Sequence, residues 1–106
     1  MVKVQISKSD KGYYRIESRE HADNSIICAA VSGIMQGLAG TMLNVEPKPH
    51  IVEMTIGKGV VIVEIEPLDT TDQKIIDVVF LFAEVSLLQI GKKYPQNIEL
   101  STTYCG

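Results

Sequence analysis

The sequence has little that would cross-link, anchor or strongly charge the chain. Only two of its 106 residues are cysteines, which excludes the multiple disulfides of small secreted scaffolds. The chain also has no tryptophan. Its main apolar stretch, residues 78–85, is interrupted by Glu84 and is far shorter than the roughly 20 residues that span a bilayer. Basic residues are not in excess either, since ten Lys and Arg face thirteen Asp and Glu. We therefore expect neither a membrane nor a nucleic acid as a direct partner.

What remains is the composition of an ordinary globular domain. Hydrophobic residues make up 45% and charged residues 22% of the chain, which is too apolar for a disordered segment. The length suits one domain spanning residues 1–106. The first residues, MVKVQISKSDKG, include no apolar stretch of the kind that directs export. We expect a cytoplasmic protein with reduced thiols.

Hydrophobic periodicity predicts five strands and two helices. Alternating apolar and polar residues, bounded by turn-forming residues, indicate strands; these are expected at 2–6, 13–17, 51–56, 60–66 and 97–103. The two helices are expected at 26–43 and from about 73 to 93. The order β-β-α-β-β-α-β, without repeats or a linker, predicts an α+β fold in which two helices pack on a mostly antiparallel sheet.

The first predicted helix has apolar residues spaced by about 3.6 positions and begins after a capping residue, either Asn24 or Ser25. Three glycines inside it, Gly33, Gly37 and Gly40, should each weaken the helix by roughly 1 kcal/mol relative to alanine. They would be tolerated if another backbone packs closely there.

The second predicted helix begins after the polar segment 69–72 and ends near Lys93, before Pro95. Its polar residues Gln73, Asp77 and Glu84 fall on one narrow stripe, and apolar residues cover most of the remaining circumference. A single small sheet cannot cover that much apolar surface. We therefore predict a homodimer whose interface uses this helix.

Cys28 and His21 are the candidate catalytic residues. Cys28 falls in the first turns of the predicted helix, where unpaired backbone N–H groups and the helix dipole favour a thiolate. His21 lies on the short connection that leads into the same helix. An imidazole close to a thiol is the minimal arrangement for nucleophilic cysteine chemistry, because the base accepts the S–H proton and later protonates the leaving group.

Simpler interpretations compete with this one. Composition alone favours Cys28 as a buried small hydrophobic residue, because its neighbours in the chain are apolar. A redox-sensing thiol would need a resolving cysteine, for which only Cys105 is available. No paired short spacing of Cys and His indicates a metal site, and no cofactor is expected.

Two further residues are candidates for binding or orienting the substrate. Ser32 lies one helical turn after Cys28 on the same face, although its hydroxyl could instead bond back to the carbonyl of Cys28. Asp23 could position His21, although an acidic residue just before a helix is common as a capping feature.

The motif His21-Ala22, a short loop, and then Cys-Ala-Ala-Val-Ser over residues 28–32 resembles the ribosomal-processing cysteine protease family known as Prp. Length and element order extend the resemblance to the whole chain. The resemblance implies a dimeric cytoplasmic endopeptidase in which Cys28 is the nucleophile and His21 the base. It implies as substrate a short N-terminal extension on a bacterial large-subunit ribosomal protein, cleaved after an aromatic residue. A non-catalytic, ribosome-associated binding or scaffold protein of the same fold is the alternative.

The chain departs from the family pattern on both sides of His21. Glu20 stands where the family usually has glycine, and the loop between His21 and Cys28 has six residues and no glycine, whereas many members have a longer one. An acidic neighbour should make His21 more basic by charge proximity.

Overall fold

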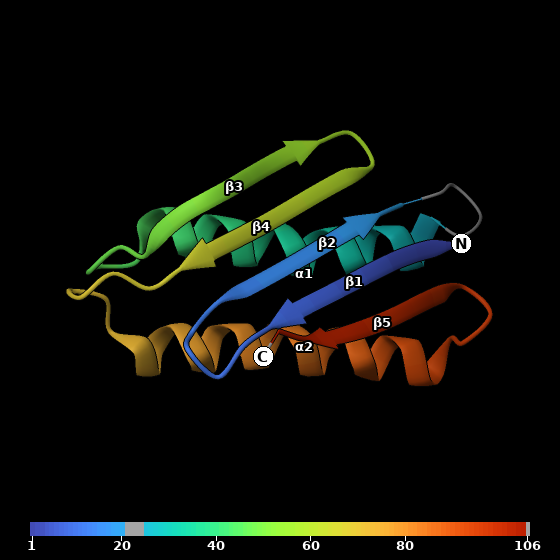
Figure 1. The fold of residues 1–106 in the computed structure, drawn as a ribbon. Helices are drawn as coiled ribbons and strands as arrows, with labels where there is room; N and C mark the ends of the chain where they lie inside the picture. Colours follow the sequence, from blue (N-terminus) through green and yellow to red (C-terminus); the bar gives the residue numbers. More distant parts are fainter. Residues whose placement is uncertain (21–24, 106) are drawn as a thin grey trace.

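The computed structural model describes residues 1–20 and 25–105 and has the predicted order of elements (Figure 1). Its five strands are β1 (Val2–Lys8), β2 (Tyr14–Arg19), β3 (His50–Gly57), β4 (Val60–Glu66) and β5 (Ile98–Tyr104). Its two helices are α1 (Ser25–Asn44) and α2 (Gln73–Lys93). The predicted elements are therefore all confirmed, and their ends differ from the expected ones by at most two residues.

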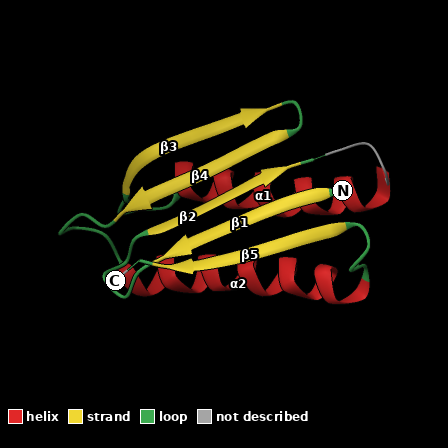
Figure 2. Ribbon diagram, turned by 45° about the vertical axis from the view of Figure 1, so that its right-hand side comes forward, coloured by secondary structure: helices red, strands yellow, loops and turns green. Residues whose placement is uncertain are grey.

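The five strands form one sheet in the order β3-β4-β2-β1-β5. All neighbouring pairs are antiparallel except β1 and β5, which are parallel. Strands β2 and β3 run in the same direction, as do β4 and β5, so each pair needs a crossover connection. The two helices provide these crossovers and lie on the same face of the sheet (Figures 1 and 2). The fold is thus two-layered, and the other face of the sheet is open.

The core lies between the helices and the sheet. Val2, Val4 and Ile6 of β1 are nearly fully buried, whereas Lys3 and Gln5 between them are exposed, as expected for a strand with one covered face. The side chains that join them from the helices share the inner side of α1 or α2; they are Ile27, Val31, Met35, Leu38, Ala39 and Met42 of α1 and Ile76, Phe80, Ala83 and Leu87 of α2.

Both helix starts can be compared with the prediction. Asp72 caps α2, because its side chain accepts hydrogen bonds from the backbone N–H groups of Lys74 and Ile75. Helix α1 already includes Ser25, and the other expected cap, Asn24, lies outside the described residues. By length and composition alone α1 could cross a membrane; its inner side nevertheless belongs to the core of the domain.

No other backbone of the described residues packs closely against the glycines of α1. An added Cβ atom at Gly33, Gly37 or Gly40 would meet nothing within 4 Å. Two of these glycines instead line an apolar groove of about 500 Å³ between α1 and α2, to which Val79 and Phe82 of α2 also contribute. The missing side chains open a surface groove, because no backbone of the described chain fills the space beside them.

Charged residues cross-link the open face of the sheet. The Glu17 carboxylate accepts hydrogen bonds from Nε of Arg19 at 2.6 Å and Nη2 of Arg15 at 2.9 Å, and Glu17 is only 9% exposed. Arg15 also lies 3.6 Å from Glu64 on β4. Burial opposes ionisation of Glu17, but the two hydrogen bonds outweigh it and lower the pKa of this carboxyl.

Candidate active site

Cys28 lies in the first turns of α1, as the sequence predicts. It is the fourth residue of the helix that begins at Ser25, so it is close to the positive end of the helix dipole. Cys28 is not part of a disulfide, and the residue is partly buried and packs against the core. Cys28 is therefore accessible enough to react yet held in place by its neighbours. A fully buried core cysteine would not meet the first condition.

Two of the predicted site residues, His21 and Asp23, lie outside the described residues. The structure does place both ends of the connection that contains them, Glu20 after β2 and Ser25 at the start of α1. The predicted roles of His21 as the base and Asp23 as an orienting group remain predictions.

Ser32 is half-buried one turn after Cys28, on the same side of α1. Its hydroxyl oxygen accepts a hydrogen bond from Nε2 of Gln36 at 3.0 Å. The hydroxyl hydrogen is not committed by this bond, so Ser32 retains a donor near Cys28.

Glu20 connects the site to the turn between β3 and β4. Its backbone N–H donates to the carbonyl of Gly59 at 2.8 Å, and Gly59 has a φ of 80°, which favours glycine. The Oε1 atom of Glu20 is buried and has no hydrogen-bond partner in the described chain. Burial raises the pKa of this carboxyl.

The sequence analysis missed Ser18, near the end of β2. Its side chain is fully buried, and its hydroxyl has no hydrogen-bond partner within residues 1–20 and 25–105. Two side-chain oxygens without a hydrogen-bond partner in the described chain, on Ser18 and Glu20, thus lie two positions apart in the sequence, just before His21. Such groups are costly to bury and often mark functional sites. The only signal in the sequence is a serine at a position where strand alternation calls for an apolar residue.

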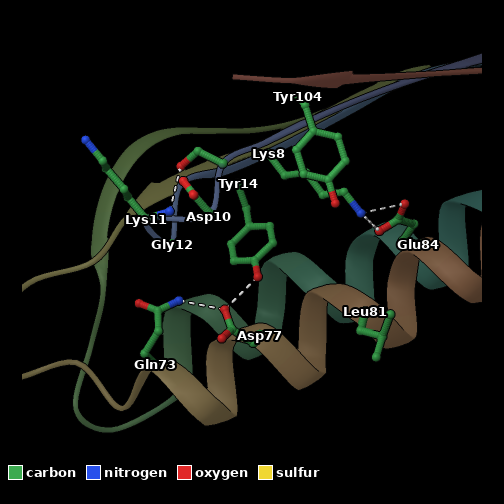
Figure 3. Close-up of a pocket in the computed structure, with 11 residues that line it drawn as sticks. Lys8, Asp10, Lys11, Gly12, Tyr14, Gln73, Asp77, Leu81, Glu84 and Tyr104 are labelled. Carbon is green, nitrogen blue, oxygen red and sulfur yellow. Dashed lines mark hydrogen bonds and ion pairs between the residues drawn. The ribbon is translucent and has the colours of Figure 1, made fainter. Parts of the chain in front are cut away.

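A polar hollow of about 430 Å³ lies at the opposite end of the sheet (Figure 3). There the Tyr14 hydroxyl donates to Asp77 at 2.6 Å, and Lys8 Nζ contacts both carboxylate oxygens of Glu84, at 2.8 and 3.0 Å. The Tyr14 ring stacks on Phe80 with centroids 4.5 Å apart. The polar stripe predicted on α2 is therefore confirmed as a stripe, and Asp77 and Glu84 hold α2 to the start of β2 and the end of β1.

The remaining Cys and His residues lie apart from Cys28. Cys105 is exposed, and its backbone N–H donates to the carbonyl of Lys8 at the end of β1. His50 is exposed at the start of β3, with Nδ1 3.7 Å from Glu66. Within residues 1–20 and 25–105, no three His, Cys, Asp or Glu residues are grouped so that they could hold a metal ion.

A partly buried cysteine in the first turns of a helix gives the chain the key feature of a thiol-dependent hydrolase. In addition, residues 1–99 match the family model of the cysteine protease Prp. The chain belongs to this family and is a cysteine protease of the Prp type. None of the curated proteins matches the sequence.

Solved structures share the fold. The ribosomal processing protease Prp from Staphylococcus aureus, in complex with a substrate peptide, is 24% identical, with a TM-score of 0.73 and coverage of 97% of this chain and 100% of that one. The same protease with a covalently linked product peptide has a TM-score of 0.72 at 24% identity, covering 99% and 100%. SMU.848 from Streptococcus mutans is 16% identical, with a TM-score of 0.72 and coverage of 99% and 96%.

Proposed function

We propose that this chain is a cytoplasmic cysteine endopeptidase that removes a short N-terminal extension from a bacterial large-subunit ribosomal protein. The observation that carries the proposal is the position of Cys28 in the first turns of α1, in a chain that matches the Prp family over residues 1–99. The similar S. aureus protein is described as a ribosomal processing protease, with bound substrate and product peptides.

In the proposed mechanism, Cys28 and His21 act as a dyad. His21 accepts the thiol proton, and the Cys28 sulfur attacks the carbonyl carbon of the scissile peptide bond. The C–N bond breaks as the imidazolium returns its proton to the leaving amine, so the N-terminal extension remains attached as a thioester. Water, deprotonated by His21, then hydrolyses the thioester and releases the extension as a carboxylic acid. Ser32 and Asp23 are proposed to bind or orient the reacting groups.

We further propose that the enzyme is a homodimer. On the outer side of α2, Val78, Phe82 and Val85 are 64%, 71% and 43% exposed, and this surface continues into the groove beside Gly33 and Gly37. Exposed apolar surface of this extent is typical of a protein–protein interface. In a dimer with a two-fold axis, the same surface of both copies forms the interface, so each contact occurs twice.

The alternative is a non-catalytic, ribosome-associated binding or scaffold protein. The exposed apolar side of α2 favours binding without favouring catalysis. A redox sensor is less well supported, because Cys105 follows the end of β5 whereas Cys28 lies near the end where β1 and β5 begin. Seven strand residues span roughly 23 Å, and a disulfide needs Cα atoms within about 7 Å.

Mass spectrometry of a large-subunit ribosomal protein precursor tests the proposal. The wild type should release the N-terminal extension, the Cys28→Ala variant should not, and the matched Cys105→Ala variant should behave as wild type. An intact precursor after incubation with folded wild-type protein would favour the binding alternative. Fast alkylation of Cys28 by iodoacetamide at neutral pH would separately distinguish a reactive thiol from an inert core cysteine.

A further inference from the structure

The position of Cys28 on α1 determines which half of the sheet its side chain faces. Helix α1 lies against β4, β3 and β2, and α2 lies against β5. Ile34 and Thr41 line the groove that α1 forms with α2. At about 100° per residue, Cys28 and Ser32 project from the opposite flank of α1. The thiol therefore faces the half of the sheet that ends in β3.

The same end of the sheet also contains the end of β3. The hydrogen bond from Glu20 N–H to the Gly59 carbonyl joins the end of β2 to the turn that follows β3, and α1 begins at Ser25, shortly after Glu20. Figures 1 and 2 show the β3–β4 turn and the start of α1 at this common end. The last residues of β3 and the first residues of β5 are thus the outer-strand residues at the same end of the sheet as Cys28, and the flank of α1 that carries Cys28 faces the β3 side.

β3 offers apolar side chains at this place. Met54 pairs with Val63, and Ile56 pairs with Val61. Both partners are buried in the core, and directly opposite residues point to the same face, so Met54 and Ile56 point toward the helices. Met54 packs against the core, but Ile56 is 52% exposed. Exposed Ile56 therefore lies on the helix-bearing face of the sheet, on the side toward which the thiol-bearing flank of α1 projects.

β3 is also an outer strand of the sheet, so half of its backbone N–H and C=O groups point away from β4 and have no strand partner in the described chain. We propose that the substrate binds as an added strand along the outer edge of β3, with Ile56 contacting an apolar substrate side chain next to the bond that Cys28 attacks. This inference rests on the proposed function of Cys28.

The occupant must be an extended, apolar peptide segment. Main-chain hydrogen bonds provide affinity in strand addition, and pockets for alternate side chains provide specificity. Val52, at the irregularity in the β3–β4 pairing, is also exposed, at 44%. The other outer strand, β5, carries Ser101, Thr102 and Thr103 and lies against α2. It therefore provides an internal control, an outer strand with a free edge on the side of the sheet away from the flank of α1 that carries Cys28.

Hydrogen exchange tests the added strand directly. The full-length Cys28→Ala protein is incubated with a synthetic ten-residue peptide of alternating leucine and glutamine with a central phenylalanine. Amides of residues 52–57 should exchange about tenfold more slowly with peptide than without it, and those of 98–104 should be unchanged. Protection confined to β5 or to the helices, or no protection at all, would overturn the proposal.

Matched charge substitutions on the two outer strands test the role of Ile56. Ile56→Lys should lower kcat/KM for the ribosomal precursor by about tenfold or more, because it removes apolar contact next to the reacting bond. Thr102→Lys on β5 should leave kcat/KM unchanged, and both variants should keep the thermal midpoint of the wild type. Equal effects of the two variants would overturn the proposal. Failure of wild type to cleave would refute the proposed function, whereas cleavage without protection of β3 would refute strand addition alone.

Discussion

Replacing Phe82 by glutamate should dissociate the proposed dimer without unfolding the protomer. The Phe82 side chain is 71% exposed in the single chain, so a charge there costs the isolated fold little. If a second copy covers this surface, about 140 Å² of aromatic surface is buried per protomer, worth about 3.5 kcal/mol. The two-fold axis doubles this to about 7 kcal/mol, or about 10⁵ in the dissociation constant. The introduced carboxylates would also lie close to one another across the axis.

Sedimentation velocity from about 1 to 100 μM measures this effect. Wild type should sediment as a dimer over this range, and Phe82→Glu as a monomer with a nearly unchanged thermal midpoint. Tyr104→Glu is the matched control, because Tyr104 is an aromatic residue of almost the same exposure, 72%, at the polar end of the sheet. It should remain a dimer. A monomeric wild type, or a Phe82→Glu variant that stays dimeric, would refute the reasoning.

Four further predictions concern the site and the sheet. Cys28→Ser should abolish peptide cleavage and Cys105→Ser should retain it; the reverse pattern in the cleavage assay would exclude Cys28 as the nucleophile. His21→Ala should lose roughly 10²- to 10⁴-fold in turnover at an unchanged thermal midpoint, whereas a parallel loss of stability would indicate a structural role. Ser18→Ala should raise the free energy of unfolding in urea by about 1 kcal/mol, because it removes a buried unpaired hydroxyl; a loss of stability would mean that the hydroxyl is paired in solution. The lowered pKa of Glu17 stabilises the fold above the pKa of the unfolded chain, so urea midpoints of wild type and Glu17→Gln should converge as the pH falls through the folded pKa.

The fold could be predicted because local and global signals agree. Strand alternation, turn residues and helical periodicity each depend on nearby residues, and the cap at Asp72 follows from its type and its position before an apolar helix. The strand order β3-β4-β2-β1-β5 and the parallel pairing of β1 with β5 were not predicted. These depend on contacts between residues far apart in the chain, for which a single sequence gives no periodic signal.

The candidate site could be predicted only in part, for the same reason. The position of Cys28 near a helix start is a local property, so it could be predicted from the sequence alone. Burial of the Ser18 hydroxyl and the Glu20 carboxylate depends on which distant residues cover β2. The alternation of apolar and polar residues along the strand does not specify those residues. The glycines of α1 illustrate the same limit: their spacing indicates a stripe, but whether a backbone or an open groove lies beside it is decided by how far α2 is from α1.

The arrangement of α1 allows dimer formation and substrate binding at the same time. Ile34 and Gly37 face the groove shared with α2, whereas Cys28 lies on the opposite flank, toward β3. A partner seated on α2 and this groove would therefore leave the outer edge of β3 open. Because of the helical period, the groove side and the Cys28 side of α1 lie on opposite flanks of the helix. Gly33 and Gly37 lie on the groove side, where the proposed second copy could fill the space beside them. The opposite flank retains the cysteine, Ser32 and their support from the core. On this geometry, a substitution such as Phe82→Glu that separates the protomers should impair cleavage only through loss of assembly, and iodoacetamide should still alkylate Cys28 in the monomer.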